Sequence, residues 1–174
     1  MAGPTATILV ANDLTPTQIR FLGDTIHSIS RDVCGDDFSV TTTRPIGGSR
    51  EFVGRPFVSS SGRLGNPLTF GYADSELQQM SRLLYVAPKV SLTFSAMCND
   101  QLDHIILARL CSHIAIEFGG VVDLNGNVEC DANEHAGLHT IDCQNYLHQT
   151  TSRHICRPEF LADYLTHDGF RMVK

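Results

Sequence analysis

A stretch near the N-terminus carries apolar residues at the three- and four-residue spacing of an amphipathic helix. The stripe consists of Ile19, Leu22, Ile26 and Ile29. Thr15 and Pro16 stand at the start of this stretch, where a threonine side chain can cap free backbone amides and a proline fits the first turn. The pattern predicts a helix over residues 16–30 with one face packed against the rest of the domain.

The longest helical pattern covers residues 102–118. Asn99 and Asp100 precede it and can cap its N-terminus, and Gly119 and Gly120 follow its last apolar position. Steps of about 100° per residue place its apolar side chains on one broad face. That face consists of Leu107, Leu110, Cys111, Ile114, Ala115 and Phe118. We therefore expect this helix to be central to the core.

Short β-favouring segments separate the helical patterns. The predicted strands cover residues 7–10, 38–43, 68–72, 90–97 and 121–124, and further helices are predicted over residues 75–84 and from Pro158 onward. Residues 44–67, rich in glycine, proline and serine, predict short strands or a hairpin with generous loops. Residues 129–151 have no clean period and predict a long functional loop. The fold class is thus α+β: one domain, residues 1–174, with two long helices on a mainly antiparallel sheet.

Length and composition agree with one globular domain. The chain has 174 residues, of which 42% are hydrophobic and 18% charged, values close to the globular norm. Its N-terminus lacks the basic and long apolar regions of a secretory signal, and no apolar run approaches the roughly 18 residues that span a bilayer. We expect a cytoplasmic protein whose six cysteines are reduced thiols.

The charge of the chain is concentrated in one stretch. Between Arg109 and Arg153 there is no lysine or arginine. The acids in that stretch are Glu117, Asp123, Glu129, Asp131, Glu134 and Asp142, which together equal the net charge of −6. This block favours docking of a basic partner and argues against direct binding of nucleic acid, which requires clustered cations.

The same stretch offers an alternative, a metal site. Cys130, His135, His139 and Cys143 are separated by four, three and three residues, so two thiolates and two imidazoles could hold zinc tetrahedrally. This alternative is a zinc-binding domain or zinc hydrolase, and His148, His154 and Cys156 are possible substitute ligands. Against it, the chain lacks the tight Cys-x-x-Cys pair of most structural zinc sites.

A second alternative uses four arginines in residues 44–63. Arg44, Arg50, Arg55 and Arg63 are accompanied there by a single acid, Glu51. Their fork-shaped guanidinium groups could hold phosphate, as in a nucleotide- or ADP-ribose-binding enzyme, although the sequence favours a solvated basic loop. The chain has no phosphate-binding Gly-x-x-x-x-Gly-Lys, no Gly-x-Gly-x-x-Gly and no Gly-x-Ser-x-Gly elbow, so no catalytic residue is predicted.

Four segments of the chain resemble a known class of proteins. They are Cys98-Asn-Asp-Gln-Leu-Asp-His104, Phe118-Gly-Gly-Val-Val-Asp-Leu-Asn-Gly126, Glu159-Phe-Leu-Ala-Asp-Tyr-Leu165 and Phe170-Arg-Met-Val-Lys174. This set, in the C-terminal half, resembles small bacterial immunity proteins encoded beside polymorphic or Rhs-type toxins. The resemblance implies a cytoplasmic protein that binds one cognate toxin domain of the Rhs or type VI kind and occludes its active site without catalysis.

The implied role agrees with the acidic block. Toxin domains that act on nucleic acids or nucleotides are often basic, and an acidic inhibitor surface speeds their encounter. The predicted partner-binding residues are Glu129, Asp131, Glu134, Asp142, Tyr146 and His148, with the acids pairing to toxin arginines or lysines and the aromatic segment serving as the buried anchor. No cofactor, membrane or nucleic acid is expected to take part.

Overall fold

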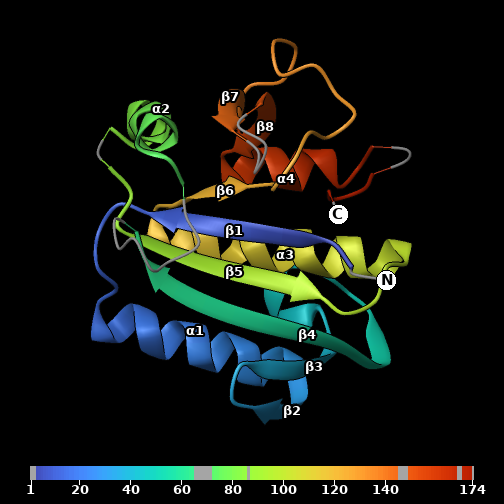
Figure 1. Ribbon diagram of the computed structural model, residues 1–174. Helices are drawn as coiled ribbons and strands as arrows, with labels where there is room; N and C mark the ends of the chain where they lie inside the picture. The colour runs from blue at the N-terminus through green and yellow to red at the C-terminus, as the bar shows by residue number, and fades with distance from the viewer. Residues whose placement is uncertain (1–2, 65–71, 86, 145–148, 168–169, 174) are drawn as a thin grey trace.

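A computed structural model describes residues 3–64, 72–85, 87–144, 149–167 and 170–173, and these form one antiparallel sheet with helices on both faces (Figure 1). The strands are β1 (Thr5–Val10), β2 (Ser30–Cys34), β3 (Asp37–Thr42), β4 (Glu51–Arg63), β5 (Val90–Ala96), β6 (Val121–Asp123), β7 (Leu138–Gln144) and β8 (Thr150–Cys156). The helices are α1 (Pro16–Ile29), α2 (Asp74–Leu84), α3 (Gln101–Phe118) and α4 (Pro158–Tyr164), with a short 3-10 turn, η1, at Arg44–Ile46.

The sheet has the strand order β2-β3-β4-β5-β1-β6-β8-β7 within the described ranges. Helices α1, α3 and α4 pack on one face, which we call the inner face, and α2 packs on the other, the outer face. Figure 1 shows α2 set apart from the other helices, close to β7. Strands β2 and β7 are therefore the two edges of the sheet, and only the β7 edge has a helix beside it on the outer face.

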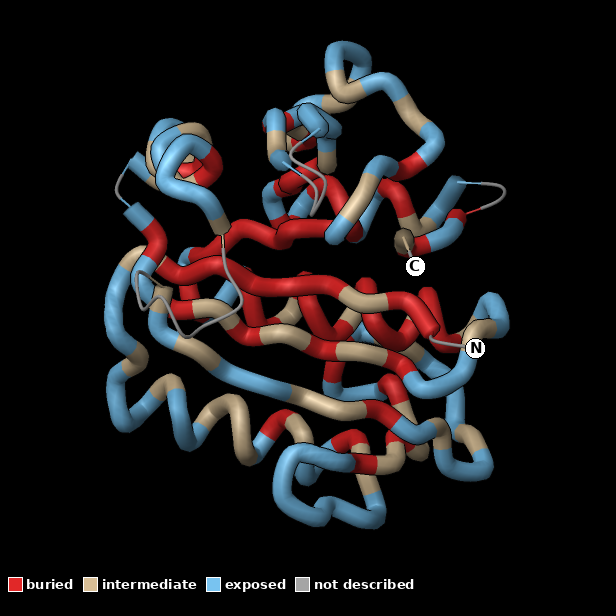
Figure 2. The backbone as a smooth tube through the Cα atoms, in the orientation of Figure 1, coloured by how far each residue is buried: buried red, intermediate tan, exposed pale blue. Residues whose placement is uncertain are grey.

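Alternation along the strands builds the inner core. In β5 the residues Val90, Leu92, Phe94 and Ala96 are buried, and the serines and threonines between them turn to the outer face. Helix α3 lies against these side chains with most of its own residues buried. Figure 2 shows the buried backbone gathered in β1, β5 and α3. The central position predicted for α3 is thus confirmed.

Local signals explain the ends of the long helices. Thr15 caps α1 through its hydroxyl, which accepts from the amide of Gln18 at 3.2 Å. Asp100 caps α3 by accepting from the amide of Leu102 at 2.9 Å. Gly119 ends α3 in the left-handed conformation, with φ of 61°, which glycine adopts at no steric cost. The α+β class with two long helices is therefore confirmed.

Strand β4 corrects the prediction of short strands and loops for residues 44–67. It is one strand of 13 residues, despite Gly54 and Pro56. Its first part pairs with β3 through Val58, and its last part pairs with β5 from Phe57 onward. Pro56 lies just before the pairing with β5 begins, where a missing backbone N–H breaks no hydrogen bond to that neighbour. Pairing with β3 and β5 thus keeps the strand continuous despite the glycine and the proline, which locally disfavour a strand.

Residues 129–151 were predicted as a long irregular loop, and this is wrong for their second half. Strands β7 and β8 pair from Leu138↔Cys156 to Gln144↔Thr150. The sequence of β7 shows no clear alternation of apolar and polar residues, because β7 is an edge strand and its exposed positions carry polar residues. The Asn125 turn has φ of 57°, as its residue type allows, but β6 pairs with β1 and β8 and forms no hairpin with β7.

Smaller differences concern the edges and the tail. Strand β2 was not predicted, and of the strand predicted at 68–72, residues 68–71 lie outside the described part of the chain. The tail buries Phe170 and Met172 without strand structure among residues 170–173. In the ranges that the structure covers, no helix combines the length and apolarity needed to cross a bilayer.

Helix α3 provides a matched test of core packing. Ile114 is 0% exposed and Ile116 is 60% exposed on the same helix. Replacing Ile114 by alanine should lower the free energy of unfolding by about 2–5 kcal/mol, because lost burial and a new cavity add. Ile116→Ala should change it by less than about 0.5 kcal/mol, as for most surface substitutions. Urea denaturation followed by circular dichroism measures both, and equal effects would contradict the packing described.

Candidate functional site

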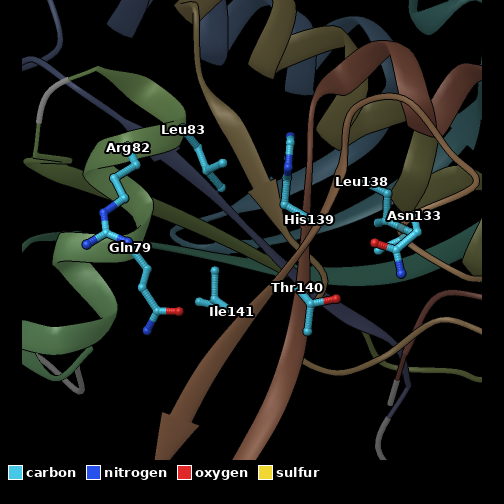
Figure 3. A pocket seen from close by; sticks show the side chains of 9 residues that line it. Gln79, Arg82, Leu83, Asn133, Leu138, His139, Thr140 and Ile141 are labelled. Atoms are coloured by element: carbon cyan, nitrogen blue, oxygen red, sulfur yellow. The ribbon is translucent and has the colours of Figure 1, made fainter.

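A groove of about 390 Å³ lies between helix α2 and the edge strand β7 (Figure 3). The third side of the groove is the segment that leads into β7, which we call the acidic loop (residues 129–137). The lining residues are Gln79, Arg82, Leu83, Ala132, Asn133, Leu138, His139, Thr140 and Ile141. Elements about 60 residues apart in sequence therefore meet around one concavity.

Gln79 connects the helix to the strand at the groove. Its side-chain nitrogen donates to the backbone oxygen of Asp142 at 3.0 Å, and its side-chain oxygen accepts from the backbone N–H of Asp142 at 3.0 Å. A primary amide carries the same donor and acceptor as a peptide group. The side chain of Gln79 thus pairs with the edge of the sheet as a neighbouring strand would, and we call this pair of bonds the Gln79 clamp.

The polar groups of the groove include few that carry charge. His139 has its pKa lowered by burial and by the positive charge of Arg157, so the imidazole is neutral at pH 7. Arg82 is then the charged side chain among the described lining residues. The amide of Asn133 and the hydroxyl of Thr140 are neutral polar groups there. Among the described residues, the lining contains no carboxylate, serine or cysteine.

The predicted acids lie on the loop that contributes one side of this groove. Glu129, Asp131 and Glu134 are exposed on the acidic loop, whose Ala132 and Asn133 line the groove itself. Across the described residues, none of the three carboxylates forms an ion pair. Their charges therefore remain available to a partner.

Two further features relate the acidic loop and β7 to the prediction. Asp131 accepts from the backbone and side-chain nitrogens of Asn133, each at 2.9 Å, which orders the tip of the loop. Asp142 exposes its side chain on β7 while its backbone holds the Gln79 clamp. The other two predicted contact residues, Tyr146 and His148, lie outside the described residues. The structure thus places three of the six predicted residues on the acidic loop and a fourth on the strand that follows it.

Beneath α2 lies a buried ionic cluster that sequence reasoning missed. Arg153 of β8 contacts Glu76 of α2 at 2.9 Å and Asp123 of β6 at 3.3 Å. Both carboxylates are almost fully buried. The ring of Tyr72 lies 4.7 Å from the Arg153 guanidinium carbon, which adds a cation–π contact. The cluster joins α2 to two strands next to the groove.

The ionisation of the cluster follows from its burial. Desolvation raises the pKa of Asp123, and the Arg153 charge opposes that rise. Desolvation and the nearby Asp123 also raise the pKa of Tyr72 well above its usual value, so the phenol stays neutral. The one sequence signal for this cluster was a charged residue, Asp123, at the end of the apolar strand β6, because buried acids require a partner.

The described part of the chain does not gather the four ligands of the zinc alternative. The described residues contain no group of three or more histidine, cysteine or acidic side chains placed to hold a metal ion. His139 and Cys143 are on β7 four residues apart, a separation of about 13 Å along a strand. The ring of His135 packs against Phe160, with centroids 5.9 Å apart. His135 lies in the acidic loop, which has no helix, and His139 lies on β7.

The remaining predicted metal ligands have other roles or no described position. Cys143 Sγ lies 3.1 Å from the hydroxyl of Thr151. Cys130 is partly buried, and its pKa is raised by that burial. His154 is buried and accepts from the amide of Val128 at 3.2 Å, and Cys156 is buried in the core. His148 lies outside the described residues.

The four arginines of residues 44–63 do not form a common anion site. Arg44 pairs with Glu51 at 3.2 Å, and Arg63 pairs with Asp13 at 3.2 Å. Arg55 donates through Nε to Asp103 at 2.9 Å and also contacts Asp100, so it fixes the N-terminus of α3. Arg55 and Arg63 lie on one strand about 26 Å apart. These guanidinium groups mainly serve ion pairs within the fold.

Comparison with known proteins places the chain in a family. No curated protein and no solved structure matches the chain. A family model described as "Family of unknown function (DUF6368)" matches residues 2–174. The chain belongs to this family. The matched range of the DUF6368 model includes the groove, the acidic loop and the ionic cluster.

The ionic cluster yields a stability prediction. Arg153→Leu leaves Asp123 buried without its counter-charge, which typically costs about 3–5 kcal/mol. The exposed Arg157 is a matched control, because among the described residues it forms no ion pair, and Arg157→Leu should change stability by less than about 0.5 kcal/mol. Urea unfolding at pH 8 measures both variants, and similar losses in the two would contradict a structural role for Arg153.

The loss caused by Arg153→Leu should also depend on pH. Burial raises the pKa of Asp123 above its unfolded value, and removal of the guanidinium raises it further. A carboxyl group with a raised folded pKa favours folding when it is protonated, and that contribution is lost as pH rises through the folded pKa. The stability difference between the variant and the original protein should therefore be larger at pH 8 than at pH 5.

Proposed function

We propose that this member of the DUF6368 family is an immunity-type protein that binds a cognate bacterial toxin domain and neutralises it by covering its active site. The observation that carries the proposal is the set of carboxylates of Glu129, Asp131 and Glu134, which are exposed on the acidic loop and form no ion pair with any described residue. The resemblance of its C-terminal half to proteins encoded beside polymorphic toxins supplies the class of partner.

Charge supports a basic partner. Elsewhere in the described structure, Glu76, Asp103 and Asp123 are buried, and each forms an ion pair with an arginine. The carboxylates of the acidic loop are not neutralised in this way and lie within a stretch free of lysine and arginine. An uncompensated patch of this kind attracts a basic domain over a distance of about 10 Å at 0.1 M salt and raises the association rate.

The groove supports a tight rather than a merely electrostatic contact. Leu83 lines it and is partly exposed, while Leu138 and Ile141 form its buried floor. Affinity in protein complexes comes largely from a few buried anchors, with charges at the rim setting encounter and orientation. The groove, with the acidic loop on one side, has this arrangement. Inhibition by coverage needs no catalytic group.

The proposal is tested by charge reversal. The variant Glu129→Lys/Asp131→Lys/Glu134→Lys should bind the toxin domain encoded beside its gene with an association rate at least about tenfold lower, because steering contributes roughly 10- to 1,000-fold. Biolayer interferometry at two salt concentrations measures this rate. The loss should be greatest at low salt, where the charges are least screened.

The opposite edge of the sheet supplies the control. Asp32, Asp36 and Asp37 are three exposed acids on the β2–β3 hairpin. Their reversal to lysine changes the net charge by the same amount and should leave most of the association rate intact. If both triple variants lose binding equally, the acidic loop is not the docking surface. If no toxin domain is encoded nearby, or the protein neither co-purifies with one nor protects cells from it, the proposed function is wrong.

A further inference from the structure

The backbone of β7 presents unpaired groups along its outer edge. Asp142 directs its N–H and C=O away from β8, because both bond to Gln79. Orientation repeats every two residues along an antiparallel strand, so Thr140 and Gln144 also direct their backbone groups outward. Arg157 N–H donates to Gly137 O at 2.7 Å, as expected if the odd positions face β8. Thr140 also lines the groove, so its outward backbone N–H and C=O lie beside it.

The Gln79 clamp marks this edge as a place where a peptide group fits. Both of its hydrogen bonds are 3.0 Å long and both go to one residue, Asp142. This is how a peptide group of an added strand would pair with the same residue. Exposed sheet edges attract further strands unless a protein covers them. At Asp142 the cover is the side chain of Gln79 from α2, and among the described residues the backbone groups of Thr140 have no hydrogen-bond partner.

We propose that an extended segment of the toxin domain adds to the sheet along β7, replacing the amide of Gln79 at Asp142 and pairing with Thr140. This inference rests on the proposed function and specifies how the partner binds. Main-chain hydrogen bonds would supply affinity, and alternate side chains of the segment would enter the groove beside Leu83.

Charge favours this occupant over a second copy of the chain. Two β7 strands paired edge to edge would bring two acidic loops and two Asp142 side chains together, with no basic group on that strand to offset them. Like charges placed across paired strands are destabilising. A segment from a basic domain meets the same acids favourably. The edge thus fits a foreign strand carrying positive charge.

The first test removes an outward N–H from the edge. Proline at position 140 cannot donate, and edge positions with an outward N–H tolerate proline. Thr140→Pro should weaken binding of the toxin domain at least tenfold. Val33→Pro is the matched control at the opposite edge: Cys34 and Asp37 flank a two-residue loop, which places Val33 outward on β2. It should leave the affinity unchanged, as calorimetric titration measures.

The second test uses the clamp itself. Gln79→Met keeps the length of the side chain but removes both hydrogen bonds to Asp142, so an incoming strand no longer has to displace them. The affinity for the toxin domain should rise several-fold, and the Asp142 amide of the free variant should exchange hydrogen faster than in the original protein. Unchanged or weaker binding by Gln79→Met would show that the amide is not displaced and would overturn the proposal.

Hydrogen exchange followed by NMR separates the two hypotheses. On saturation with the toxin domain, the amide of Thr140 should exchange at least tenfold more slowly. If the domain binds and Thr140 exchange does not change, strand addition is wrong while the proposed function stands. If the domain does not bind at all, the proposed function itself fails. If Gln79→Met instead forms a dimer in sedimentation that Thr140→Pro abolishes, the edge accepts a second copy, and strand addition by a toxin is overturned.

Discussion

A carboxylate in a protein interior is tolerated only with a partner, and in this fold two such carboxylates share one guanidinium group. Arg153, on β8, forms ion pairs with Glu76 of α2 and Asp123 of β6. The geometry of the fork therefore fixes where α2 can stand relative to the two strands. The position of α2 in turn sets the width of the groove and brings Gln79 to the edge of β7. The outer face depends on this one ionic contact.

The predictable part of the fold is the part with a local signal. Helices α1 and α3 can be predicted from their apolar periodicity and from capping residues such as Thr15 and Asp100. Both signals act within a few residues of the chain. Strand β4 is concealed by Gly54 and Pro56, and its length comes from two neighbours that pair with different halves of it. Such pairing depends on residues distant in sequence, and no local pattern records it.

The candidate site divides along the same line. The acidic loop is visible in the sequence because charge is a property of each residue, and the structure exposes Glu129, Asp131 and Glu134 as a surface would require. The groove is not visible, since one wall comes from α2 and the other from β7. The described residues do not gather the ligands of the zinc alternative for a related reason: His139 and Cys143 have a spacing that is short on a helix and long on a strand.

Helix α2 is attached to the domain in an unusual way. Outside its apolar contacts with residues such as Leu9 and Ile155, it is held by one ion pair and one side-chain amide, and it lies on the face opposite to the main core. Helices α1, α3 and α4 pack on the opposite face, so the contacts that hold one wall of the groove are separate from those that hold the main core.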